Sequence, residues 1–148
     1  MRILITEDEP LIALSLAMEL EQAGHEVIGP AATIEASLRL ARMHRVDLAL
    51  LDIDLQQRGD GVIVAKRLRE MDIPAVFVSG QDAVAHDNAD LALGYIGKPY
   101  NPSDIVRSVA VIDAVLHGKT PPPPQLPAES RSSTTIAQPN PRSAPSTA

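Results

Sequence analysis

Five polar side chains stand where short apolar runs of the sequence end. An acidic pair follows the first run, one carboxylate ends the third, a hydroxyl ends the fourth and an ammonium follows the fifth. These residues are Glu7, Asp8, Asp52, Ser79 and Lys98. Taken singly, an Asp or Ser after a strand usually caps a turn or a helix, and a lone Lys is usually a solvated charge. If the runs are parallel strands of one sheet, however, their carboxyl ends share one edge and the five groups converge there.

The chemistry of such a convergence is restricted. Three carboxylates crowded together repel one another and lose solvation, so they require a cation. The chain has no cysteine, and none of its four histidines ends a predicted strand. Oxygen ligands alone select a hard metal such as Mg²⁺, which keeps positions open for phosphate oxygens. A hydroxyl and an ammonium nearby suit a tetrahedral anion. The pattern predicts Mg²⁺ as the cofactor of a site for a phosphate-like group.

The apolar runs alternate with helix-length segments across residues 1–117. The predicted strands are residues 3–6, 26–28, 48–52, 75–79 and 94–96. The predicted helices are residues 10–23, 33–44, 61–71, a weaker stretch at 82–91, and 103–117. The third strand begins with four consecutive apolar residues, which is typical of a central parallel strand covered on both faces. Five βα units predict an α/β fold, a doubly wound five-stranded parallel sheet with helices on both faces.

Composition sets the remaining bounds. A net charge of −6 and a pI near 5.1 argue against a nucleic-acid partner, which needs a basic face. The first apolar run is too short for a signal peptide, and the sequence has no apolar stretch of 18 residues. We therefore expect no membrane association and a cytoplasmic location.

The composition changes near Gly118. Residues 118–148 hold eight of the thirteen prolines and nine Ser or Thr residues. Such a segment buries too little apolar surface to offset the entropy of ordering it. We predict a domain over residues 1–117 and a disordered Pro/Ser/Thr-rich tail over 118–148, with a docking or linker role as the alternative.

Four stretches carry the five polar residues in a fixed order. They are residues 3–9 (ILITEDE), 47–55 (DLALLDIDL), 77–80 (FVSG) and 97–100 (GKPY). Asp8 and Asp52 lie 44 residues apart. In order and spacing, these stretches resemble the receiver domains of two-component response regulators, which have a flavodoxin-like fold. The resemblance covers about residues 1–117 and is that of a stand-alone receiver.

The resemblance implies a role for each residue. Asp52 would be the phosphoacceptor. Asp8 would bind Mg²⁺ directly and Glu7 through water, with the backbone carbonyl of Asp54 as a further ligand. Lys98 would pair with the carboxylate or the phosphoryl group, and the family often has a cis peptide bond after this lysine.

The resemblance also implies a switch. Ser79 would hydrogen-bond the phosphoryl group, helped by the amide of Gly80. Tyr95 takes the place of the family's aromatic switch residue, although an ordinary half-buried strand tyrosine is the alternative. The interval from Ser79 to Lys98 is shorter than is common in the family. Poor helix formers crowd it, so the fourth helix is expected to be short or irregular. They are Asp82, Asp87, Asn88 and Asp90.

The function implied is signal transduction through protein partners. The donor would be a histidine kinase or a phosphotransfer protein, and residues 74–80 resemble receivers paired with HWE-type kinases. A downstream protein target, or a second copy in a dimer, would bind the face formed by the fourth helix, fifth strand and fifth helix. The chain would not be an enzyme beyond its own phosphotransfer and dephosphorylation.

Two other functions fit part of the pattern. A pseudo-receiver would bind partners without being phosphorylated. A haloacid-dehalogenase-type phosphatase also forms an aspartyl phosphate, and Asp52 and Asp54 resemble its nucleophile motif. That family places its motif on the first strand with a later acidic pair, whereas here the acidic pair of Glu7 and Asp8 comes first.

Overall fold

Alternating strand and helix segments fold as the hydrophobic pattern predicts. The computed structural model describes residues 1–80, 82–120 and 134–136. The strands are β1 (Arg2–Thr6), β2 (Glu26–Ala31), β3 (Leu48–Asp52), β4 (Ala75–Ser79), β5 (Gly94–Gly97) and β6 (Thr134–Ile136). The helices are α1 (Pro10–Gln22), α2 (Ile34–Met43), α3 (Asp60–Glu70), α4 (Asp82–Asp87), the 3₁₀ helix η1 (Ala89–Leu91) and α5 (Pro102–Leu116).

The strands form one sheet in the order β2-β1-β3-β4-β5-β6. Strands β1 to β5 are all parallel, so their carboxyl ends share one edge. The predicted doubly wound five-stranded parallel sheet is confirmed. Strand order reverses between β1 and β3, and ligands of such sheets bind at that point.

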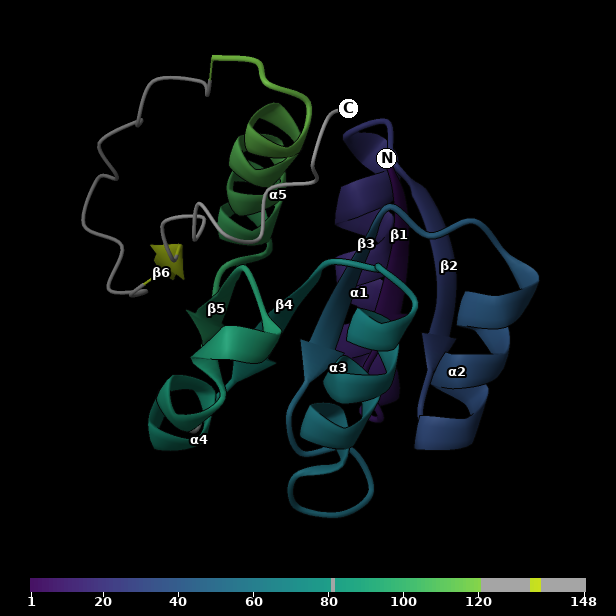
Figure 1. Ribbon diagram of the computed structural model, residues 1–148. Coiled ribbons are helices and arrows are strands. Elements are labelled where there is room, and N and C mark those ends of the chain that lie inside the picture. The colour runs from purple at the N-terminus through teal and green to yellow at the C-terminus, as the bar shows by residue number, and fades with distance from the viewer. Residues whose placement is uncertain (81, 121–133, 137–148) are drawn as a thin grey trace.

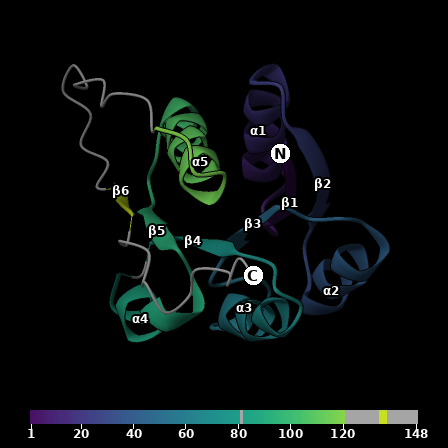
Figure 2. The ribbon, with the colours of Figure 1, turned by 45° about the horizontal axis from the view of Figure 1, so that its top comes forward.

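Helices cover both faces of the sheet (Figures 1 and 2). Helices α1 and α5 lie on one face, over a core that includes Ile5, Leu50 and Ile105. Helices α2, α3 and α4 lie on the other, over a core that includes Leu51 and Phe77. Every residue of β3 and β4 is buried, because each of these strands lies between two others and beneath helices on both sides.

Local signals set the helix ends. Pro10 occupies the first turn of α1, and Gly24, with a φ of 92°, follows its end. The side chain of Asn101 caps α5 by accepting a hydrogen bond from the amide of Ser103. Helix α4 has only six residues and is followed by the separate 3₁₀ helix η1. The prediction of a short, irregular fourth helix is confirmed.

Two strands differ from the sequence-based expectation by more than one residue. Strand β2 runs to Ala31 instead of ending at Ile28, past a register irregularity opposite Leu4 and Thr6. Strand β6 was not expected at all. It pairs antiparallel with β5 and adds a sixth strand at that edge of the sheet (Figure 2). The rest of the predicted tail, residues 121–133 and 137–148, lies outside the described residues.

Within the described part of the chain, no helix combines the length and the apolar character needed to cross a membrane.

Candidate functional site

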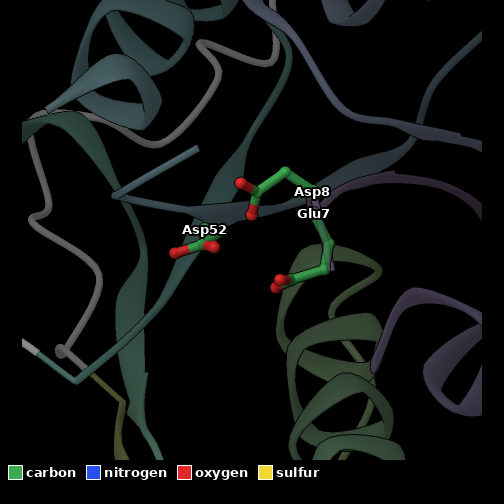
Figure 3. A group of neighbouring side chains, drawn as sticks. All are labelled: Glu7, Asp8 and Asp52. Carbon is green, nitrogen blue, oxygen red and sulfur yellow. The ribbon is translucent and has the colours of Figure 1, made fainter. Parts of the chain in front are cut away.

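Three carboxylates meet at the carboxyl edge of the sheet (Figure 3). Glu7 and Asp8 follow β1, and Asp52 is the last residue of the neighbouring β3. One carboxylate oxygen from each of the three lies within 4.8 Å of the other two. Glu7 and Asp52 are buried, and Asp8 is half-buried. The three could together hold a hard divalent cation, which would offset their mutual repulsion.

Lys98 provides the positive charge of the site. Its Nζ lies 3.1 Å from Oε2 of Glu7 and 3.4 Å from Oδ2 of Asp52. Its side chain is 23% exposed, whereas those of Glu7 and Asp52 are 3% and 8% exposed. Lys98 therefore has the most accessible side chain of these three residues.

The end of β5 leads directly into this lysine. The backbone amide of Lys98 donates to the carbonyl oxygen of Ser79 at 2.8 Å, which ties β5 to the end of β4. Ser79 is 2% exposed. The Lys98–Pro99 peptide bond is cis, as the resemblance implied. The predicted hydroxyl and ammonium thus belong to adjacent strands at the same edge as the carboxylates.

The loop after β3 is held by the acidic residues themselves. The amide of Asp54 donates to Oδ1 of Asp52 at 3.1 Å, and the amide of Gly59 donates to Oδ1 of Asp54 at 3.0 Å. The amide of Gly61 then donates to the carbonyl oxygen of Ile53 at 2.8 Å. Sequence reasoning missed Gly61. An ideal Cβ on this residue would lie 2.0 Å from the carbonyl oxygen of Asp52, so only glycine lets α3 begin this close to the end of β3.

Tyr95, the predicted switch residue, lies away from the carboxylates along β5. It is half-buried, pairs in register with Phe77 of β4 and packs with the α4 side of the core. Its ring meets that of His86 edge to face, with centroids 5.4 Å apart. A small apolar cavity of about 60 Å³ adjoins the pair. Its lining includes Ala85 and Ala89, so α4 and η1 meet β5 at this tyrosine.

Burial and charge set the protonation of the site. Burial, followed by the charge of Glu7, raises the pKa of Asp52 to about 6, although Lys98 acts in the opposite direction. Burial alone would lower the pKa of Lys98, but the charges of Asp52 and Glu7 outweigh it, so that pKa is raised. Asp52 is therefore mainly ionised at pH 7 and Lys98 stays cationic, which suits a nucleophilic carboxylate beside an anion-binding group.

Tyr100 is a second residue that sequence reasoning left without a role. Its hydroxyl is buried and has no hydrogen-bond partner among the described residues. Burial, together with the charge of Glu7, raises the pKa of Tyr100 to about 12, so the hydroxyl keeps its proton. The position, two residues after the lysine and directly after Pro99, is the one signal in the sequence that could have drawn attention to it.

The raised pKa of Asp52 predicts a pH dependence of stability in Mg²⁺-free buffer. The unfolded chain loses this proton near pH 4 and the folded chain near pH 6, so Asp52 lowers the free energy of unfolding as pH rises from 4 to 6. Comparison with Asp52→Asn isolates the effect. We expect the variant and the unmodified chain to have similar free energies of unfolding near pH 4. At pH 7 the free energy of unfolding of the variant should be higher by on the order of 2 kcal/mol. Urea denaturation measures both. A difference that does not change with pH would contradict the raised pKa.

The family model for the response regulator receiver domain matches residues 3–110. The chain belongs to the response regulator receiver family. The matched range contains β2 to β5 and all of β1 except Arg2. It also contains the three carboxylates and Lys98, so it covers the whole site.

Relatives of known name are longer proteins. The transcriptional regulatory protein PdtaR of Mycobacterium tuberculosis is 32% identical over 112 residues, which are 73% of this chain and 54% of PdtaR. The phyllosphere-induced regulator PhyR of Methylorubrum extorquens is 34% identical over 107 residues, 70% of this chain and 40% of PhyR. The receiver thus spans about half the length of these relatives or less.

Solved structures share the fold. A CheY-like receiver domain protein from Methanospirillum hungatei is 30% identical, with a TM-score of 0.65 over 73% of this chain and 89% of that one. The response regulator TrrA from Thermotoga maritima, solved in complex with Mg²⁺ and BeF, is 28% identical. Its TM-score is 0.66 over 73% of this chain and 95% of its own.

Proposed function

We propose that this receiver is a phosphorylation-controlled signalling module whose acceptor is Asp52. The observation that carries the proposal is the meeting of three carboxylates with Lys98 at one edge of the sheet. A structural role alone would not explain it, because the single ammonium of Lys98 does not neutralise three carboxylates, and the remaining repulsion costs stability unless a further cation offsets it.

The proposed reaction is phosphoryl transfer from a phosphohistidine. One oxygen of the Asp52 carboxylate bonds to phosphorus while the bond from phosphorus to the imidazole nitrogen breaks, and that nitrogen keeps the electron pair. A carboxylate is a modest nucleophile, so the rate depends on in-line positioning and on charge neutralisation. The hydrogen bond from the amide of Asp54 orients the carboxylate, and Lys98 is near enough to move from Glu7 towards the incoming oxygens.

Mg²⁺ would be held by Asp8 and Asp52 directly, by Glu7 through water and by the backbone carbonyl of Asp54, and it would supply charge neutralisation for the transferred group. The carboxylate cluster fits this ion, and the related TrrA structure contains Mg²⁺ and BeF. Ser79 would donate to a phosphoryl oxygen. These roles leave no group for turnover of an external substrate, so the chain would act on its own phosphoryl group alone.

Phosphorylation would switch the face made by α4, β5 and α5. A phosphoryl group shifts an equilibrium only through contacts that differ between the two states. Here those contacts are with Ser79 and Lys98, whose backbones are joined by a hydrogen bond. Tyr95 lies three residues before Lys98 and packs against His86 of α4, so movement of β5 would reach α4 through this ring contact.

The partners follow from the family. The phosphoryl donor would be a histidine kinase, of the HWE type or another, or a phosphotransfer protein. A downstream protein, or a second copy of the chain, would bind the switched face. PdtaR is named a transcriptional regulatory protein, but the acidic charge of the present chain supports a protein target over nucleic acid.

Acetyl phosphate labelling, with and without Mg²⁺, separates the candidate functions. A receiver gains one phosphoryl group in the presence of Mg²⁺ and little in its absence, measured by intact mass. A pseudo-receiver gains none, and a phosphatase turns over acetyl phosphate many times without retaining label. Absence of Mg²⁺-dependent label in a folded sample would refute the proposed function.

Mg²⁺ is expected to stabilise the chain before any phosphorylation. If the dissociation constant is about 1 mM, 10 mM Mg²⁺ adds about 1.4 kcal/mol, or about 3 to 6 °C in Tm. The matched pair is Asp8→Asn and Glu9→Gln: the first removes a proposed ligand, the second neutralises the exposed neighbouring charge. We expect Asp8→Asn to lose most of the response and Glu9→Gln to keep it. A Tm indifferent to Mg²⁺ in the unmodified chain would count against a metal site.

A further inference from the structure

The outer edge of β5 is covered by a distant segment of the same chain. Strand β6 pairs antiparallel with β5, with Gly94 opposite Ile136 and Ile96 opposite Thr134. It also contacts α5. Figure 2 shows β6 on the side of β5 away from β4. Without it, the backbone groups of β5 on that side would form an unpaired sheet edge, which is a template for any extended peptide.

The sequence explains why this segment forms the strand. Thr134, Thr135 and Ile136 are three consecutive β-branched residues, the only such run in residues 118–148. β-Branched side chains favour the extended conformation, whereas the prolines that fill much of the tail cannot donate to a strand ladder. The pairing of β6 with β5 also needs no side-chain pocket, because it is made through backbone hydrogen bonds.

The covering strand is held weakly. Three residue pairs supply few backbone hydrogen bonds, and each has a small net value in water. Residues 117–133 separate α5 from β6, so closing this long segment costs entropy that opposes the pairing. A strand with these opposing contributions can be displaced by a competitor for the same edge.

We propose that the outer edge of β5 is a strand-docking site occupied in cis by Thr134–Ile136, which competes with partners for this edge. Tyr95 stands opposite Thr135 in the middle of the pairing, so β6 lies beside the residue proposed to switch. A protein that uses the α4, β5 and α5 face must then displace β6. The role of Tyr95 as a switch and the displacement of β6 by a partner rest on the proposed function. The docking of β6 itself requires neither Mg²⁺ nor a phosphoryl group.

Proline substitution in the full chain tests whether Thr134–Ile136 occupies the outer edge of β5. Ile136→Pro removes a strand amide within β6, and Ala128→Pro is the matched control elsewhere in the tail. Successive strand amides alternate between edges. The amide of Leu93 donates to Ala75 on the β4 side, so those of Gly94 and Ile96 should face β6.

The readout is amide hydrogen exchange by NMR, in Mg²⁺-free buffer. We expect Ile136→Pro to accelerate exchange at Gly94 and Ile96 by about tenfold or more. Leu93 should stay unchanged, as should all three amides in Ala128→Pro. Unchanged exchange at Gly94 and Ile96 in Ile136→Pro would overturn the proposal. Protection that rises with protein concentration would also overturn it, because the strand would then come from a second copy.

Binding in trans tests the edge as a docking site. A labelled peptide with the sequence of residues 131–140 should bind the Ile136→Pro chain with a dissociation constant of about 0.1 mM, against an effective concentration of about 1 mM for the tethered strand of the unmodified chain. It should bind the unmodified chain at least about tenfold more weakly, because the resident strand competes. Equal affinity for both chains, or binding to neither, would overturn the proposal. Either outcome leaves the phosphoacceptor role of Asp52 untouched, since acetyl phosphate labelling tests that role separately.

Discussion

Replacement of Asp52 by Asn is expected to abolish covalent phosphoryl labelling while the chain stays folded. The amide has nearly the shape of the carboxylate but offers no anionic oxygen to attack phosphorus. It also removes one of the buried like charges at the end of β3, so the metal-free variant should be more stable than the unmodified chain at pH 7. Labelling should fall from one phosphoryl group per chain to none detectable by intact-mass spectrometry.

Asp47→Asn is the matched control. Asp47 immediately precedes β3 at the opposite end from the site, where it accepts a hydrogen bond from the amide of Arg2 at 2.8 Å. It should therefore keep full labelling. If Asp52→Asn keeps full label as well, the acceptor is another residue and the assignment of Asp52 is wrong.

Gly61→Ala is expected to be among the most damaging single substitutions in the chain. The added methyl group would meet the carbonyl oxygen of Asp52 at 2.0 Å and the Cα of Ile53 at 2.6 Å. Both are backbone atoms, so no side-chain rotation relieves the clash. The start of α3 must move away from β3, and we expect a loss of more than about 3 kcal/mol in the free energy of unfolding.

Gly80→Ala provides the comparison, because its added methyl group would have Lys98 Cβ as its nearest neighbour at 4.0 Å. We expect this variant to change stability by less than about 1 kcal/mol. Urea denaturation measures both variants. Equal stability of the Gly61→Ala and Gly80→Ala chains would show that α3 does not need its close approach to β3.

Much of the fold could be predicted because its strands are defined by local sequence. The apolar run before Asp52 identified a buried central strand, and Asp and Asn residues between Ser79 and Lys98 identified a weak fourth helix. Strand β6 could not be predicted in the same way. Its three β-branched residues favour an extended conformation, but they lie in a Pro-rich tail, and they form a strand because a distant edge is available to pair with them.

The candidate site was predictable to the extent that parallel strands bring their ends together. Glu7, Asp8 and Asp52 do meet, and Lys98 does reach Glu7 and Asp52. The contribution of Gly61 was not predictable. Space for a side chain is missing at this residue because α3 packs against β3, and such a tertiary contact does not show in the helix or strand propensity of the local sequence. The roles of these residues in phosphoryl transfer stay predictions until labelling tests them.

The scarcity of aromatic residues gives the chain an intrinsic optical reporter. It has no tryptophan and two tyrosines, Tyr95 and Tyr100, which stand on either side of Lys98. One ring is half-buried against His86, and the other carries a buried hydroxyl close enough to Glu7 to sense its charge. With excitation at a wavelength where only tyrosine absorbs, the emission of the unmodified chain therefore comes from these two residues. Titration with Mg²⁺ or beryllofluoride can be followed there without a dye, and Tyr95→Phe and Tyr100→Phe would assign each change to one side of the lysine.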